Sequence, residues 1–476
     1  MKKLKAQSES VLTKARDFLY TDIYILTVLA IVFIAWVTQF ATFGFVALIA
    51  ISCVALVLSD DILPLTVNIF GAVLMIYKGS VAEYVYLWPT LIPLGVAIIV
   101  FIVRNFKKRM TFGKMFLPQL AVSCALLLGG IGVVSSERYL VALPISIALG
   151  FGVLAVYLLY ANFFNRQRKT DVGAYFAKVM SYIGIVVGLE LIVAIVRSNL
   201  SSGQWSGAYF DVGWGNRNNI ATYLLFAAPF SIYLSTRKKH GWIYVLLSAF
   251  QYACLIMTLS RGGILCGFIA GLFALVFSIV KAPDRRKQAV YWVCVFVAIG
   301  MLAAIFHDWV GGVFDSLMTR VKVDGDVSSG RFELYKEAWS LFKKYPFAGA
   351  GMGYNGYNAG MLNDMGLYWF HSTVFQILGC LGIVGVLAYV WFYVKRILIF
   401  AKKAKSGFAL FVFAAWFGFE GYSLIDTGTM SPYPFMMLVI VTTFLLEVAD
   451  DTNYETVVGG VPKRLYDGAT YVRQTF

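Results

Sequence analysis

The stretch from Ser260 to Lys281 reads SRGGILCGFIAGLFALVFSIVK, and it decides the class of the fold. No charged residue lies between Arg261 and Lys281, and a helix rising about 1.5 Å per residue over this length spans the hydrocarbon core of a bilayer. The rest of the chain has the same character, since 60% of its 476 residues are hydrophobic, 14% are charged and the mean hydropathy is +0.75. This composition predicts an all-α polytopic membrane protein.

Apolar runs of roughly 15–25 residues predict about 12–14 transmembrane helices. The first run is expected to stay as an uncleaved anchor, because the basic start of the chain is not closely followed by a short apolar core and a cleavage site. All six cysteines fall inside apolar runs, so free, buried thiols are expected. Fourteen runs are counted, and they begin near Ile23, Phe43, Pro64, Leu91, Phe116, Tyr139, Tyr175, Ile220, Trp242, Gly263, Ala289, Thr373, Phe408 and Pro432.

Lysine and arginine are distributed unevenly between the connections. With the N-terminus in the cytoplasm, 29 of the 40 basic residues fall on the cytoplasmic side and 11 on the outer side. Because basic residues accumulate in cytoplasmic loops, this asymmetry predicts an even number of spans and a cytoplasmic C-terminal tail. The net charge of +15 is then explained by insertion and by attraction to anionic membrane lipids, and nucleic acid is not expected as a partner.

The longest outer segment covers about 307–372, and a second covers about 197–219. Long connections with structure of their own are usually functional. Within the longer one, Phe332, Tyr335, Trp339 and Phe342 recur at helical spacing, which predicts an amphipathic helix that ends at Pro346 and lies on the membrane surface. Three regions are expected: N-terminal transmembrane helices over 1–196, a catalytic region over 197–400, and C-terminal helices with a cytoplasmic tail over 401–476.

Two motifs in the longer outer segment suggest cofactor or metal binding. The run from Gly351 to Gly356 matches a dinucleotide fingerprint, but it follows a helix and a proline instead of a strand, so a glycine-rich loop close to a substrate is the preferred interpretation. Asp324 and Asp326 could grip Mg²⁺ or Mn²⁺, although short acidic turns are common in exposed loops. No metal or other cofactor is expected.

Three outer arginines border apolar runs or the long loop. Arg217 stands between Asn216 and Asn218 before one run, Arg261 opens another, and Arg331 opens the amphipathic helix. A guanidinium fork matches two phosphate oxygens and stays charged, so these arginines are expected to bind a diphosphate. Each alone could instead anchor a helix end at the lipid headgroups.

His371 stands where the long outer segment returns to the membrane, and His307 stands near its other end. Histidine can take a proton near neutrality, so His371 is the candidate base and His307 is its competitor. Glu190, Glu420 and Asp426 lie in or near apolar runs, where carboxylates are costly and are usually paired or functional. Glu190 is the most deeply embedded, and a structural pair with an arginine is preferred for it over catalysis.

The order and spacing of these segments, over about 190–390, resemble the bacterial O-antigen ligase and Wzy-type polymerase family. The resemblance rests on Asn216-Arg217-Asn218, Ser260-Arg261-Gly262-Gly263, Gly330-Arg331-Phe332 through Trp339, Pro346 to Gly351, His371, and Gly379 to Gly385. It implies a GT-C-like, metal-independent glycosyltransferase of polysaccharide biosynthesis, with its active site on the outer face of the cytoplasmic (inner) membrane.

The donor that this resemblance implies is a glycan on undecaprenyl diphosphate, and the acceptor is a glycan, a glycolipid or a protein. Its expected catalytic residues are His371, Arg261 and Arg331, and its expected substrate-binding residues are Asn216, Arg217, Asn218, Arg261 and Arg331. Within the enzyme class, ligation, polymerisation and protein O-oligosaccharide transfer stay open. A lipid-linked glycan flippase or exporter is the rival class, but it would carry more charges at mid-membrane depth.

Overall fold

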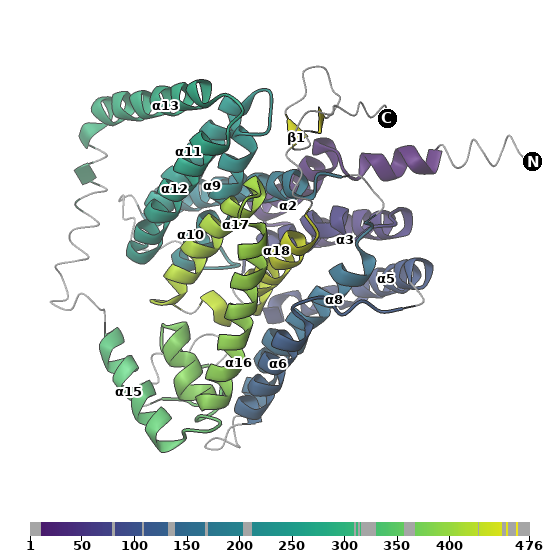
Figure 1. The fold of residues 1–476 in the computed structure, drawn as a ribbon, viewed down its shortest axis with the longest axis vertical. Helices are drawn as coiled ribbons and strands as arrows, with labels where there is room; N and C mark the ends of the chain where they lie inside the picture. Colours follow the sequence, from purple (N-terminus) through teal and green to yellow (C-terminus); the bar gives the residue numbers. More distant parts are fainter. Residues whose placement is uncertain are drawn as a thin grey trace, which may run out of the picture.

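A computed structural model describes most of the chain, and its described part is helical apart from one short strand pair. This pair joins β1 (Tyr454–Glu455) to β2 (Lys463–Arg464). The prediction of an all-α polytopic membrane protein is confirmed (Figure 1). The described residues are 11–78, 81–106, 109–131, 139–166, 170–202, 212–308, 311–312, 315, 330–356, 367–426, 428–449, 454–455 and 463–464.

Each of the fourteen apolar runs forms a helix or a succession of short helices. Seven helices of the described chain are long and apolar enough to cross a membrane, or eight if the bent pair 11–18 and Asp22–Thr38 is one span. Shorter apolar helices accompany them, and the exact number of crossings stays a prediction. The elements are α2 (Asp22–Thr38), α3 (Ala41–Leu58), η1 (Leu63–Leu65), α4 (Thr66–Gly71), η2 (Ala72–Met75), η3 (Val81–Thr90), α5 (Leu91–Asn105), α6 (Phe116–Ile131), α7 (Tyr139–Ile147), η5 (Ala148–Gly152), α8 (Val153–Phe163), α9 (Val172–Ser202), α10 (Arg217–Ser235), α11 (Gly241–Met257), α12 (Arg261–Lys281), α13 (Arg285–Ile305), α15 (Arg331–Lys344), α16 (Thr373–Lys403), α17 (Gly407–Ser423), η7 (Gly428–Met430), η8 (Pro432–Met436) and α18 (Met437–Val448).

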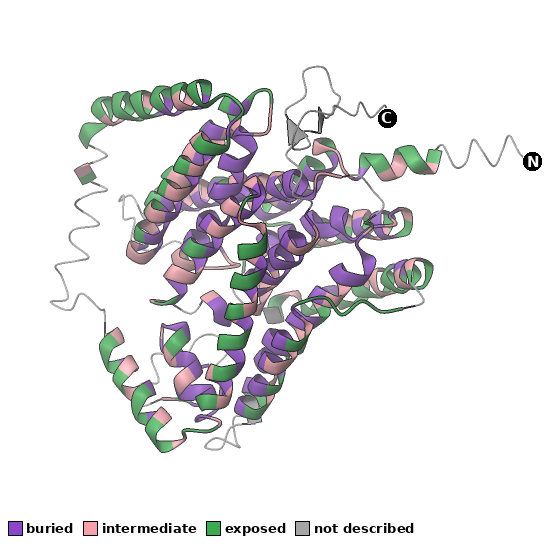
Figure 2. Cartoon of the chain, in the orientation of Figure 1, coloured by how far each residue is buried: buried purple, intermediate pink, exposed green. Residues whose placement is uncertain are grey.

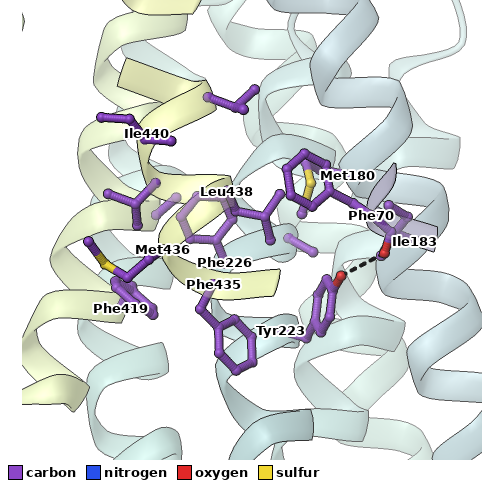
Figure 3. Close-up of a cluster of buried hydrophobic side chains, with 14 of the residues drawn as sticks. Phe70, Met180, Ile183, Tyr223, Phe226, Phe419, Phe435, Met436, Leu438 and Ile440 are labelled. Carbon is purple, nitrogen blue, oxygen red and sulfur yellow. Dashed lines mark hydrogen bonds between the residues drawn. The ribbon is translucent and has the colours of Figure 1, made fainter. Parts of the chain in front are cut away.

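Helix α10 forms the centre of the bundle, because every residue from Ile220 to Ser235 is buried. It packs against α9, α11, α12 and α17, and aromatic rings of α10 and α17 meet residues of η8 and α18 in one cluster (Figure 3). Lipid tails are as apolar as leucine, so close packing and internal hydrogen bonds must hold such helices together. By contrast, α13 is largely exposed (Figure 2), as expected for a helix that faces lipid.

The predicted amphipathic helix is α15, and it ends at Lys344, two residues before Pro346. Leu334, Ala338 and Leu341 form its buried side, whereas Phe332 and Trp339 of the predicted aromatic face are exposed. Helix α15 packs against α16, where small residues permit close approach. Contact of the exposed aromatic side chains with a membrane surface stays a prediction.

Helix α16 is broken at Gly382, where φ is 60° and ψ is −156°. The glycine-rich loop after α15 runs beside this break: the Ala350 N–H donates to the Gly379 carbonyl at 2.8 Å, and the Ile383 N–H donates to the Pro346 carbonyl at 2.8 Å. A Cβ on Gly349 would lie 2.3 Å from the Cys380 carbonyl carbon, so only glycine fits there. The loop thus supplies hydrogen bonds that the broken helix lacks, and its closeness to a substrate stays a prediction.

The long outer segment, about 307–372, and the C-terminal tail are predicted to lie on opposite sides of the membrane. Cysteines introduced at Ser329 and at Thr470 in a Cys-free background, both outside the described residues, test this with an impermeant thiol reagent. The cation asymmetry predicts that only Ser329→Cys is labelled in intact cells, and that both are labelled after permeabilisation. Equal labelling in intact cells would overturn the fourteen-span topology.

Candidate functional site

Asp426 lies between α17 and η7, and three parts of the chain meet at its carboxylate. Asn218 Nδ2 donates to Asp426 Oδ2 at 2.9 Å, and the Tyr422 hydroxyl donates to the same oxygen at 3.2 Å. Asp426 Oδ1 lies 3.4 Å from His371 Nδ1. The Asp426 side chain is 13% exposed, so it depends on these polar neighbours. The carboxylate therefore ties the start of α10, the start of α16 and the end of α17 together.

The start of α10 is fixed by a capping box. Asn216 Oδ1 accepts hydrogen bonds from the backbone N–H groups of Asn218 and Asn219, and Asn219 Oδ1 accepts one from the Asn216 N–H at 3.2 Å. Arg217 is consequently the first residue of the helix. Its guanidinium has no hydrogen bond or ion pair within the described part of the chain, and it is partly exposed.

Helix α12 begins beside α10. The Ser260 hydroxyl donates to Asn218 Oδ1 at 3.1 Å and lies 2.9 Å from the Tyr422 hydroxyl. Arg261 follows as the first residue of α12. A Cβ on Gly263 would lie 2.8 Å from the Ala221 Cβ, so glycine at this position lets the two helices approach closely. The amide nitrogen of Asn218 thus donates to Asp426, and its amide oxygen accepts from Ser260.

Arg331 is the first residue of α15, and it reaches the same place. Its Nη1 donates to the Ile425 carbonyl at 2.5 Å, next to Asp426 in the chain. One turn later, the Tyr335 hydroxyl donates to the His371 carbonyl at 3.2 Å. Burial raises the pKa of Tyr335, so its hydroxyl remains a donor near neutral pH. Arg331 therefore holds α15 beside Asp426, and Tyr335 holds it beside His371.

His371 adopts a left-handed backbone conformation with φ of 48°, which is uncommon for a residue other than glycine. Such conformations persist where surrounding contacts hold them, and they are frequent at functional sites. Leu259, next to Ser260, is also left-handed, with φ of 52°. A carboxylate at Nδ1 favours the tautomer with its proton on Nδ1, which leaves Nε2 as a proton acceptor. The His371 side chain is 32% exposed and is thus partly accessible from outside the bundle.

His307 is placed differently. Its side chain is 74% exposed, its Nε2 lies 3.2 Å from Asp308 Oδ1, and among the described residues no hydrogen bond or ion pair joins it to the arginines. The structure therefore brings His371, and not His307, to Asp426 and Arg331. The acidic pair Asp324 and Asp326 lies outside the described residues.

The other embedded carboxylates have structural partners. Glu420 accepts a hydrogen bond from Arg396 at 2.5 Å and another from Tyr393 at 3.0 Å. The prediction that Glu190 pairs with an arginine is wrong: Glu190 Oε2 accepts a hydrogen bond from the Trp214 indole at 2.7 Å. The reason is that Trp214, ahead of α10, places its indole N–H beside Glu190 of α9.

Residue types and spacing pointed to the arginines, Asn218 and His371, but not to the roles of Asp426, Ser260, Tyr335 and Tyr422. Asp426 was noticeable only as a carboxylate at the end of an apolar run. Tyr422 precedes it by one helical turn, which is a weak signal for a shared face. Their convergence depends on segments more than 200 residues apart, such as Asn218 and Asp426.

A comparison with family models matches residues 243–390 to the family described as O-antigen ligase. A search of curated proteins found no match. The matched region includes Arg261, Arg331 and His371, whereas Arg217, Asn218 and Asp426 lie outside it. Over residues 243–390 the chain is thus similar to the O-antigen ligase family, and this similarity supports a ligase- or polymerase-type, glycosyltransferase-like activity in general.

Proposed function

We propose that the protein is a GT-C-like, metal-independent glycosyltransferase that transfers a glycan from undecaprenyl diphosphate to an acceptor hydroxyl on the outer face of the cytoplasmic membrane. The observation that carries the proposal is the meeting of four helix starts around Asp426. Helices α10, α12 and α15 each begin with an arginine, and α16 begins two residues after His371. Helix N-termini favour anions, and arginine adds full positive charge. This arrangement suits a diphosphate.

The reaction follows from these positions. The prenyl chain of the donor lies in the membrane, and its diphosphate binds Arg217, Arg261 and Arg331. His371 Nε2 accepts the proton of the acceptor hydroxyl as the acceptor oxygen bonds to the anomeric carbon. The bond between that carbon and the diphosphate oxygen breaks, and undecaprenyl diphosphate leaves. Asp426 stabilises the imidazolium that forms, and the arginines stabilise the charge on the leaving diphosphate.

The arginine cluster is expected to make a divalent cation unnecessary, because guanidinium groups neutralise the diphosphate directly. Transfer by the purified protein should therefore persist in EDTA and should not increase when Mg²⁺ or Mn²⁺ is added back. If EDTA abolished transfer and either cation restored it, the pair Asp324 and Asp326 would replace the arginines as the leading site.

The proposal is tested by incubating purified protein with a defined undecaprenyl-diphosphate oligosaccharide and, in turn, a lipid A-core, a second lipid-linked glycan and a protein acceptor. Transfer predicts one molecule of undecaprenyl diphosphate released for each acceptor glycosylated. The acceptor that supports release identifies ligation, polymerisation or protein glycosylation. In reconstituted vesicles, movement of intact lipid-linked glycan across the bilayer with no release would support the exporter class instead.

A further inference from the structure

Glu190 is a buried acid for which the proposed reaction has no direct use. It is 0% exposed on α9, and its Oε1 has no hydrogen-bond partner among the described residues. Its Oε2 accepts one hydrogen bond, from the Trp214 indole at 2.7 Å. A buried carboxyl group with one donor is unfavourable in the core of a bundle. The contribution of Glu190 therefore depends on the role of its hydrogen-bond partner, Trp214.

Trp214 belongs to a short segment that is held from other sides as well. The Trp36 indole on α2 donates to the Val212 carbonyl at 2.7 Å. Gly213 has φ of 86°, and a Cβ there would lie 2.1 Å from the carbonyl carbon of Tyr77, so this segment lies directly on the backbone after η2. The N-terminal helices thus hold residues 212–214 in place through two indole hydrogen bonds and one backbone contact.

Residues 212–214 directly precede the candidate site in the chain. Trp214 is two residues before the helix cap Asn216 and three before Arg217. A chain advances at most about 3.6 Å per residue, so a shift of Trp214 is transmitted to the start of α10 with little slack. The Trp214 ring also packs edge-on against Tyr223 of α10, at 5.5 Å between centroids. Tyr223 donates to the Phe70 carbonyl at 2.8 Å (Figure 3).

We infer that Glu190 and Trp36 hold Trp214 and Val212 as a clamp that fixes the start of α10, and with it Arg217, at the donor diphosphate. Glu190 is a positioning residue that acts as a hydrogen-bond acceptor, and its charge is not required. The clamp lies outside the matched region 243–390, so it gives the N-terminal helices a part in the site. The identity of the ligand rests on the proposed function, but the clamp itself does not.

The test compares Glu190→Leu, which removes the acceptor, with Glu190→Gln, which keeps an acceptor oxygen without a charge. Trp214→Phe removes the donor while keeping a ring, and it serves as a second route if Glu190→Leu does not fold. Trp416→Phe is the matched control, because its buried indole bonds to Thr442 at 3.3 Å between α17 and α18. Amide hydrogen exchange over 212–219 and the Kd for undecaprenyl diphosphate are measured in each purified variant.

Glu190→Leu and Trp214→Phe should both speed exchange over 212–219 and weaken diphosphate binding by roughly tenfold, the upper range for one hydrogen bond. Glu190→Gln and Trp416→Phe should stay within about twofold of wild type in both measurements. In an Arg217→Ala background, Glu190→Leu should add no further loss of binding, because the clamp acts through Arg217.

Unchanged exchange in Glu190→Leu, equal losses in the Leu and Gln variants, or a loss that adds fully to that of Arg217→Ala would each overturn the clamp. Failure of the proposed function can be distinguished from failure of the clamp. Wild-type protein that binds no undecaprenyl diphosphate would reject that ligand, while the exchange measurement would still decide whether Glu190 holds the start of α10.

Discussion

His371→Ala is expected to lower the rate of glycan transfer by roughly 10²–10⁴-fold, the range for loss of a general base. The reason is that His371 Nε2 accepts the proton of the acceptor hydroxyl, while Asp426 at 3.4 Å holds the other ring nitrogen. The measurement is turnover at saturating donor, paired with the Kd for the donor. Turnover should fall and donor binding should persist, because the arginines remain.

His307→Ala is the matched control, since it removes an exposed imidazole from the other end of the same outer segment. It should retain wild-type turnover. Full activity of His371→Ala together with loss in His307→Ala would move the base to His307.

Arg261→Ala should lower turnover by roughly 10–10²-fold, because losing one charge-assisted contact costs about 1.5–3 kcal/mol. The loss can be larger where the contact strengthens as charge develops on the leaving diphosphate. Arg261→Lys should also be impaired, since an ammonium group cannot reproduce the two-pronged contact of a guanidinium.

Lys343→Ala provides the control for Arg261, because Lys343 is an outer-segment cation near the end of α15, where its ammonium lies over the Trp339 ring. It should leave turnover unchanged. If Arg261→Ala turned over at the wild-type rate, at equal abundance in the membrane, Arg261 would be removed from the site.

Much of the fold could be predicted because membrane helices are encoded locally. Each apolar run became helical, and α15 followed from the spacing of its aromatic residues and from Pro346. The buried face of α15 could not be predicted, since Leu334, Ala338 and Leu341 are buried only because α16 lies beside them. The break at Gly382 also could not be predicted from the sequence, because a glycine within an apolar run has several possible roles.

The site was only partly predictable for a related reason. Arginines and a histidine at the borders of apolar runs are conspicuous because charge is costly there. Asp426 and Glu190 were equally conspicuous, but their partners depend on which helices meet. Asn218 and Asp426 are 208 residues apart, and no local pattern joins them. The positive φ values of Leu259 and His371 follow from tertiary contacts in the same way.

We propose that arginines from three helix starts recognise a diphosphate beside His371. The most direct measurement is the Kd of purified protein for undecaprenyl diphosphate and for undecaprenyl monophosphate, in wild type and in Arg217→Ala, Arg261→Ala and Arg331→Ala. The wild type is expected to bind the diphosphate more tightly than the monophosphate by on the order of tenfold or more, and each substitution is expected to lower this ratio of affinities. Equal affinity for the two lipids, or a preference that survives all three substitutions, would contradict it.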